Sequence, residues 1–166
     1  MTEDAVDNVR RAWAARFPEL DTSPLDIFGR VRRIAVLVQL AADRVLAVHD
    51  VSRADFDIIS TLARGERPLT PSEIAAETLT SPAGTTKRLQ RLITVGMVKR
   101  TPNPDDGRGA LIELTPRAEE LVLPVLQDLS ALEQDLVKAL TAEDKQNVAD
   151  GLREVLVALE GGGASG

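Results

Sequence analysis

Apolar residues recur at intervals of three and four along most of the chain, which is the spacing of amphipathic helices. This pattern predicts helices at about 3–16, 24–48, 53–64, 71–78, 82–95, 116–140 and 142–159. Several helix starts carry a Ser or Thr cap followed by Pro, whose missing N–H costs nothing in the first turn. These pairs are Ser23-Pro24, Thr70-Pro71, Ser81-Pro82 and Thr115-Pro116, and Ser52 and Thr141 begin capping boxes with Asp55 and Asp144. We also expect Gly96 to end the fifth helix and Pro124 to kink the sixth.

The hydrophobic pattern changes after the fifth helix. MVKRTP and ALIEL are strand-like, and the NPDDGRG between them consists of turn-forming residues. A short helix, a tight LTS connection, a second helix and a hairpin in this order are typical of a winged helix-turn-helix. The sequence therefore predicts a mainly α fold with a small β-hairpin wing, in which residues 51–114 form the DNA-binding domain.

The long helices on either side of this domain carry apolar stripes of their own. Residues 23–50 and 115–160 exceed what a single DNA-binding module needs, and a second copy of the chain is the best cover for their stripes. We therefore expect dimerisation helices and a homodimer; the alternative is that these helices only cover the core of their own chain. Residues 1–22 are expected to form an extra N-terminal helix and linker, and residues 161–166 a flexible tail.

Composition narrows the classes of function. The 166 residues include no Cys and one His, His49, so we expect no thiol chemistry, metal site, cofactor or His-based catalysis, and no enzyme activity. Aromatic residues make up 2% of the chain, so the core has to be aliphatic. The acidic start MTEDAVDN is no signal peptide, and no apolar run approaches the ~18 residues of a membrane span. These features predict a soluble cytoplasmic protein.

Charge is unevenly distributed along the chain. The net charge is -6, yet residues 81–108 alone carry +4. A basic patch on an acidic body is expected where one face meets DNA phosphates. Chance clustering is the alternative explanation for the patch.

The helix expected at 82–95 separates into distinct faces on a helical wheel of about 100° per residue. Thr85, Leu89, Leu92 and Ile93 define the buried face. Lys87 and Arg91 point away from it, toward phosphates or base edges. The predicted DNA contacts on this helix and its cap are Ser81, Ala83, Thr85, Thr86, Lys87, Gln90 and Arg91. Arg88 lies about 85° from the centre of the buried face, so it is aimed back toward the protein.

The segment LTPSEIAAETLTSPAGTTKRLQRLITVGMVKRTPNPDDGRGALIELTPRAEEL resembles the central domain of MarR-family transcriptional regulators. The resemblance rests on the helix-turn-helix, on LTPRAEEL and on the run Gly96, Arg100, Asp106 and Arg108, and it extends over about residues 28–159. It implies a triangular dimer of winged helices that binds a palindromic operator in double-stranded DNA. It also implies that Arg108 of the wing enters the minor groove, with Asp106 as its brace.

The N-terminal segment RRAWAARFPELDTSPLDIFGRVRRI resembles the urate-responsive branch of that family. The ligand residues of the branch correspond here to Trp13, Asp57, Arg88 and Arg100. The loop ARGERPLT is short by comparison, but it lies away from these four positions. The resemblance implies a repressor that urate, or a similar planar anion, releases from its operator.

These assignments suggest an electrostatic switch in which Asp57 pairs with Arg88 and Arg100 until an anion competes for the guanidiniums, while Trp13 offers a stacking surface. Structural alternatives remain open, namely a core Trp13, a plain Asp57–Arg88 salt bridge, a phosphate contact by Arg100 and an ordinary turn pair of Asp106 and Arg108. The competing functions are the same repressor answering a tricarboxylate or an aromatic acid, and a winged-helix module that binds protein.

Overall fold

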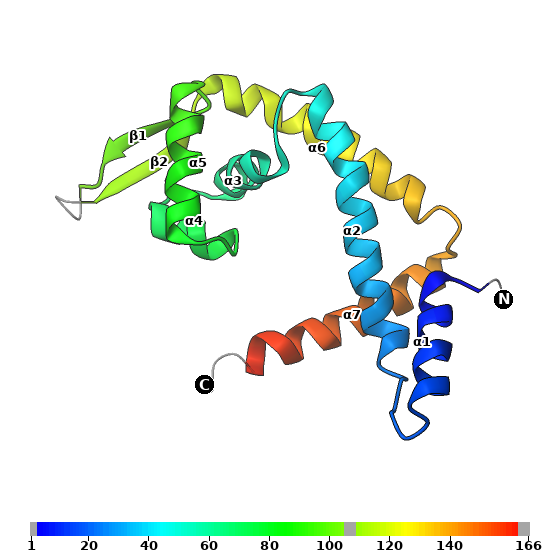
Figure 1. Ribbon diagram of the computed structural model, residues 1–166. Coiled ribbons are helices and arrows are strands. Elements are labelled where there is room, and N and C mark those ends of the chain that lie inside the picture. The colour runs from blue at the N-terminus through cyan, green and yellow to red at the C-terminus, as the bar shows by residue number, and fades with distance from the viewer. Residues whose placement is uncertain (1–2, 105–108, 163–166) are drawn as a thin grey trace. The chain divides into compact units, whose positions relative to one another are not determined.

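The computed structural model of the chain describes residues 3–104 and 109–162 (Figure 1). It divides into two units, residues 1–125 and 126–166, which are described separately. The elements are α1 (Ala5–Arg16), α2 (Leu25–Val48), α3 (Arg53–Arg64), α4 (Pro71–Glu77), α5 (Pro82–Thr94), β1 (Val98–Pro102), β2 (Ala110–Leu114), α6 (Pro116–Leu136) and α7 (Ala142–Gly162). The expected fold class, mainly helical with a two-stranded hairpin, is confirmed.

Most helix starts agree with the predicted caps, because capping is a local interaction. Thr70 and Ser81 accept hydrogen bonds from the backbone of the first turns of α4 and α5, and Thr141 and Asp144 form a capping box before α7. The predicted Ser23 cap is wrong. Pro24 occupies the N-cap position of α2 in the right-handed helical region, and no side chain caps it, since the turn before it already engages the backbone.

Two helix ends differ from the prediction. The helix α6 ends at Leu136 rather than near residue 140, because the chain must turn before the capping box that starts α7 at Ala142. The helix α7 continues to Gly162, two residues into the expected tail. Pro124 lies inside α6 as expected; the kink at this position stays a prediction.

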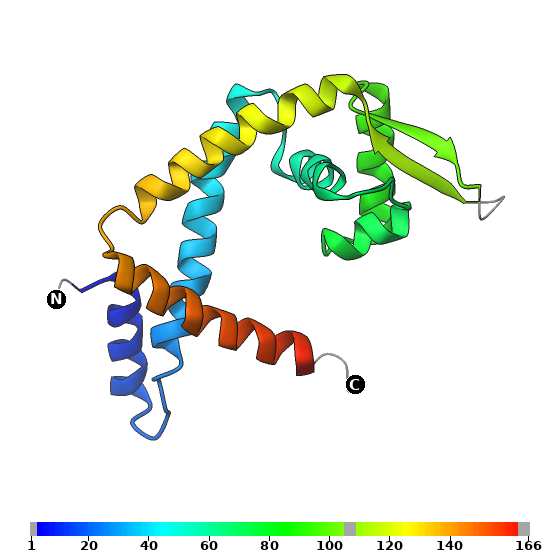
Figure 2. The same ribbon diagram turned by 180° about the vertical axis from the view of Figure 1, so that it is seen from behind.

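The core of the winged helix-turn-helix is aliphatic, as the composition predicts. Buried side chains come from every element of this part of the first unit, namely Ile58, Ile59, Ile74, Leu89, Leu92, Val98 and Ile112. Figures 1 and 2 show α3, α4 and α5 gathered beside the hairpin. Phe56 is the aromatic member of the core among the described residues.

The strands β1 and β2 are antiparallel, with Val98 opposite Leu114 and Pro102 opposite Ala110. A further backbone pair, which the sequence did not reveal, joins Leu69 to Ile112 in both directions at 3.1 and 2.8 Å. This pair attaches the loop before α4 to the wing.

The turn between α4 and α5 contains a conformation that leucine rarely adopts. Leu79 has a φ of 51° and is 95% exposed. A left-handed backbone costs a residue with a Cβ roughly 1–2 kcal/mol. Because the side chain is exposed, it makes almost no packing contacts that could offset this cost.

Replacing Leu79 by Asn is therefore expected to stabilise the protein. Asn tolerates the left-handed region better, so the free energy of unfolding should rise by about 0.5–1 kcal/mol. Urea unfolding of Leu79→Asn and Leu79→Ala provides the measurement. Alanine keeps the strain, so an equal gain in both variants would contradict the strain argument.

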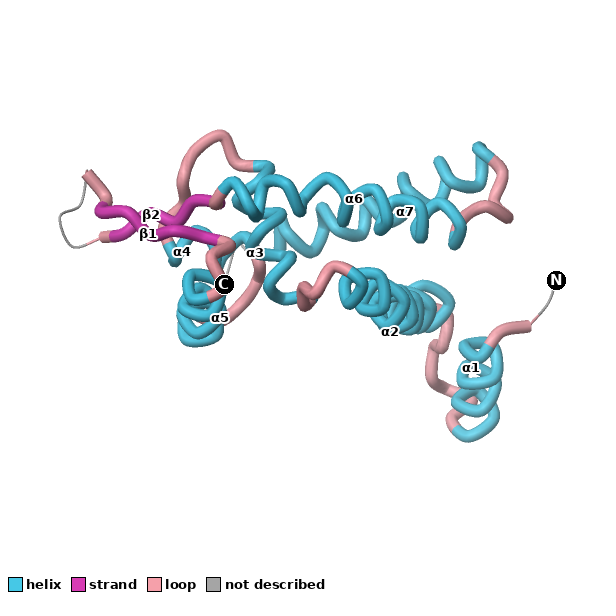
Figure 3. Tube along the Cα trace, turned by 90° about the horizontal axis from the view of Figure 1, so that it is seen from above, coloured by secondary structure: helices cyan, strands magenta, loops and turns pink. Residues whose placement is uncertain are grey.

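The first helix packs on the N-terminal part of α2. Val6 is 6% exposed and covers Gly29, where an added Cβ would lie 2.7 Å from a Val6 methyl group. Arg30 of α2 joins Asp4 and Asp7 at 2.8 Å each. Backbone hydrogen bonds, and after them these contacts with Arg30, hold the pKa of both carboxyls below the usual range against the effect of desolvation. Seen from above, α1 lies at the end of α2 remote from α5 and the hairpin (Figure 3).

Candidate nucleic-acid interface and ligand site

The helix α5 is held at both ends by local chemistry. The Ser81 hydroxyl accepts a hydrogen bond from the Gly84 backbone at 3.2 Å, and Pro82 occupies the first turn. Gly96, with a φ of 72°, reverses the chain after the helix, where only glycine is unstrained. The helix therefore has a defined start and end relative to the wing.

One face of α5 is exposed, as the wheel predicts. Its exposed members are Ala83, Thr86, Lys87, Gln90 and Arg91, together with the cap Ser81. Leu89 and Leu92 are buried on the opposite face, but Ile93 is 39% exposed, so its predicted burial is wrong. The exposed members are accessible to DNA; that they contact it stays a prediction.

Thr85 is a correction to the predicted DNA contacts. Its side chain is 1% exposed, and its hydroxyl lies 2.7 Å from that of Thr80, which lies 2.8 Å from that of Thr78. A hydroxyl that is buried in this hydrogen-bonded row cannot reach a DNA groove. The three hydroxyls instead connect α4, the turn and α5.

The start of α4 is a complete capping box. The Glu73 carboxylate accepts from the Thr70 backbone at 2.7 Å, while the Thr70 hydroxyl accepts from the Glu73 backbone at 3.3 Å. The hydrogen bond from Arg67 and those from Thr70 lower the pKa of Glu73 from 4.5 to about 2. The cap thus orients the first helix of the helix-turn-helix.

This pKa makes part of the stability depend on pH. Because the folded pKa is depressed, the contribution of Glu73 is complete above about pH 4.5 and is lost as the pH falls toward 2. The side chain is 38% exposed, so we expect the effect to be about 1 kcal/mol. Urea unfolding of the wild type and Glu73→Gln at pH 7 and pH 3 measures it. A stability difference that does not shrink at pH 3 would contradict the assignment.

Two of the predicted DNA contacts, Asp106 and Arg108, lie outside the described residues. On the strands, Lys99 pairs with Glu113 at 3.4 Å. Arg100 lies opposite Ile112 and is exposed. Within the described ranges Arg100 has no ion pair.

The expected ion pairs of Asp57 are wrong. Asp57 pairs with Arg53 of its own helix at 3.2 Å, and it pairs with neither Arg88 nor Arg100. Arg88 is half-buried, as its sideways position on the wheel suggests, and has no ion pair among the described residues. The ion pair between α3 and α5 instead joins Asp55 to Arg91.

The sequence does not reveal the Asp55–Arg91 pair, because capping and periodicity are local patterns and the two residues lie 36 positions apart. It predicts Asp55 only as the capping partner of Ser52, and Arg91 only as a DNA contact. The available signal was the spacing of Asp55, which lies three and four residues before the apolar Ile58 and Ile59 and so shares their helical face. A carboxylate at such a position needs a cationic partner.

Trp13 is not close to the other predicted ligand residues within one chain. Its ring stacks on Phe17 with centroids 5.8 Å apart, and the side chain is 46% exposed. A helix rises about 1.5 Å per residue, so the part of α2 from Gly29 to Val48 separates α1 from the start of α3 by roughly 28 Å. The four positions are therefore not assembled in the single chain.

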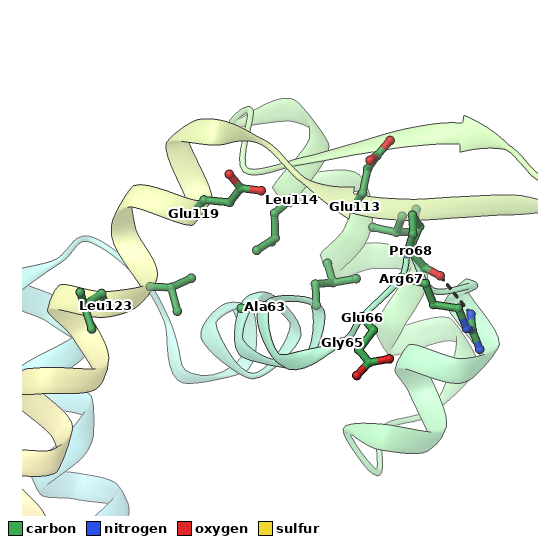
Figure 4. Close-up of a pocket in the computed structure, with 12 residues that line it drawn as sticks. Ala63, Gly65, Glu66, Arg67, Pro68, Glu113, Leu114, Glu119 and Leu123 are labelled. Carbon is green, nitrogen blue, oxygen red and sulfur yellow. Dashed lines mark hydrogen bonds between the residues drawn. The ribbon is translucent and has the colours of Figure 1, made fainter.

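The first unit contains a pocket of about 490 Å³ between the end of α3, the following loop, β2 and α6 (Figure 4). Glu119 and Leu114 lie along one side of it, whereas Arg67 donates to the Pro68 carbonyl at its edge. None of the four predicted ligand residues lines this pocket. Across residues 3–104 and 109–162, no group of three or more His, Cys, Asp or Glu side chains is arranged to hold a metal ion.

Comparison with known proteins supports a regulatory function. Residues 49–109 match the model of the MarR family. The chain is 31% identical to the multiple antibiotic resistance protein MarR of Escherichia coli, over 81% of this chain and 98% of that protein. It is 29% identical to the transcriptional regulator PecS of Dickeya dadantii, over 86% of this chain and 87% of PecS.

A solved structure is similar over the same region. A mutant of E. coli MarR in complex with operator DNA has a TM-score of 0.66 and 29% identity, covering 80% of this chain and 97% of that one. No helix in the described part of the chain is long and apolar enough to cross a membrane. The expectation that the chain is no enzyme agrees with its relatives, which are transcriptional regulators. With this identity, coverage and winged helix-turn-helix, the chain belongs to the MarR family of transcriptional regulators.

Proposed function

We propose that the protein is a dimeric repressor that binds a two-fold symmetric operator through α5 and the wing. The observation that carries this proposal is the exposed face of α5, where Lys87 and Arg91 lie one helical turn apart on a helix fixed at both ends. The similarity to E. coli MarR, solved with operator DNA, supports the same use of the fold.

Selection of duplexes from a random pool tests operator binding without knowledge of the natural site. A dimer with two recognition helices should enrich a palindromic motif whose half-sites lie about one helical turn, roughly 10 bp, apart. Affinity for the selected duplex should fall steeply with salt, because phosphate contacts release counter-ions. A pool without an enriched motif, or binding insensitive to salt, would favour the protein-interaction module instead.

We further propose that a small planar anion, of which urate is the best candidate, releases the protein from DNA. Arg88 supports this assignment, because a half-buried guanidinium with no ion pair among the described residues favours an anionic partner. Asp57 and Arg100 are its proposed neighbours in the site. A site that also includes Trp13 requires a second copy of the chain or a different position of α1.

Titration of the intrinsic fluorescence with urate tests this second proposal, because Trp13 is the only Trp of the chain. We expect saturable quenching by urate that Arg88→Ala abolishes and Arg64→Ala, a control at an exposed ion pair with Glu77, preserves. A response to citrate or salicylate but not to urate would replace urate by another anion. Silence with all three would remove Trp13 from the site.

A further inference from the structure

An ion pair joins the start of α3 to the exposed face of α5. From it we infer that Asp55 is a positioning residue for operator binding, which holds the Arg91 guanidinium where it meets a DNA phosphate. The inference rests on the proposed use of α5 as the recognition helix. It assigns a function to a residue that itself does not touch DNA.

The two partners differ sharply in exposure. The side chain of Asp55 is 4% exposed, whereas that of Arg91 is 57% exposed. One nitrogen of the guanidinium, Nη1, donates to Asp55 Oδ2. Because a guanidinium has five N–H donors, the exposed part of Arg91 retains donors for a second acceptor.

Asp55 is itself held in place by the first turn of α3. The Ser52 hydroxyl donates to the same Oδ2, and it accepts from the Asp55 backbone at 3.2 Å. The carboxylate also lies at the positive end of the α3 macrodipole. Arg91 is thus anchored to a fixed point 36 residues earlier in the chain.

Anchoring changes how Arg91 meets a phosphate. A free arginine loses much of its rotamer freedom when it binds, whereas an anchored one has lost it during folding. The anchor also keeps the guanidinium on the exposed face that Lys87 shares, one helical turn away. The geometry therefore favours tight contact by Arg91 despite the nearby negative charge.

Because Asp55 is negatively charged, the direction in which its neutralisation changes the DNA affinity tests the inference. If Asp55 acted on DNA only through its charge, its neutralisation would tighten binding, since the carboxylate repels phosphates. If Asp55 positions Arg91, neutralisation weakens binding. Asp55→Asn therefore separates the two effects.

The experiment measures affinity for the selected duplex by fluorescence anisotropy for five proteins, namely the wild type, Asp55→Asn, Arg91→Gln, the double variant and Glu77→Gln. Glu77 is the matched control, because it is an exposed carboxylate of the same domain that pairs with Arg64 at 3.3 Å. We expect Asp55→Asn to weaken binding at least fivefold and Glu77→Gln to change it less than twofold. In the Arg91→Gln background, Asp55→Asn should have no further effect.

Two results would overturn the inference. One is binding by Asp55→Asn that equals or exceeds that of the wild type. The other is an equal loss with and without Arg91, which would show that Asp55 only caps α3. A wild type that binds no duplex would overturn the proposed function as well, and is thereby distinguished from a failure of Asp55 alone.

Arg91→Lys gives a second test that does not depend on the folding of an Asp55 variant. Lysine keeps the charge but lacks the planar fork that can bind two acceptors at once. We expect Arg91→Lys to lose most of the affinity that Arg91→Gln loses. Wild-type affinity of Arg91→Lys would show that charge alone suffices, which contradicts anchoring.

Discussion

Replacing Leu152 by Glu is expected to convert the protein to monomers that bind the selected duplex at least 100-fold more weakly. The helix α7 has no buried residue, and its apolar stripe consists of Val148, Leu152, Leu156 and Leu159, which are 45–63% exposed. Full burial of an exposed leucine contributes about 1.5–3 kcal/mol, so a dimer that covers the exposed half of each leucine gains roughly half of that, and a buried unpaired Glu would oppose association further. A helix of this kind is only marginally stable without a packing partner, because most helical stability in proteins comes from tertiary packing.

The same argument applies to α2. Ile34, Leu37 and Leu40 are 54–58% exposed on that helix. We expect a second copy of the chain to cover both stripes, since the proposed two-fold operator needs two recognition helices.

Light scattering during size exclusion gives the mass of each variant, and anisotropy gives its affinity for DNA. Asn147→Glu adds the same charge at an exposed position of α7 about 120° away from the stripe, so it should remain dimeric. A dimeric Leu152→Glu would place the interface elsewhere. A monomeric wild type would show that the stripes cover their own chain.

The second large effect is expected at Lys87. Reversal of its charge by Lys87→Glu should weaken binding to the selected duplex more than 100-fold, because it replaces a phosphate contact by repulsion in both subunits. Lys87 is exposed on α5 and has no ion pair among the described residues, so its loss leaves the fold intact.

Salt dependence shows whether the lost contact is with phosphate. Each contact contributes about 0.9 to the slope of log affinity against log salt, so Lys87→Ala in a dimer should reduce the slope by about 2. Lys138→Glu makes the same charge change between α6 and α7, where Lys138 pairs with Asp135, and should change affinity less than threefold. A weaker Lys87→Ala with an unchanged slope would argue against a phosphate contact.

The proposed ligand site is less complete in the single chain than the exposed face of α5. The resemblance to the urate-responsive branch depends on four positions that are far apart in the sequence, and the single chain does not assemble all of them. Arg88 has the half-buried, sideways position that the wheel predicts, whereas Asp57 is engaged with Arg53. Urate therefore stays a proposal that depends on the fluorescence titration.

The sequence by itself determined the helices, the hairpin and the exposed face of α5, because periodicity, caps and turns act over a few residues. Thr70 and Ser81 illustrate this, since each caps its helix as predicted. Where local signals failed, as at Ser23 or the end of α6, a neighbouring turn or cap had already satisfied the backbone.

Only the tertiary structure decided which charged groups meet. Asp55 and Asp57 are two residues apart on α3, but helical geometry buries the first beneath α5 and leaves the second beside Arg53. The wheel places Thr85 on the buried face although it also stands among the expected DNA contacts, and the burial of its hydroxyl against Thr80 decides between the two. Such partners depend on how helices pack over long sequence separations, and local patterns carry no information about that.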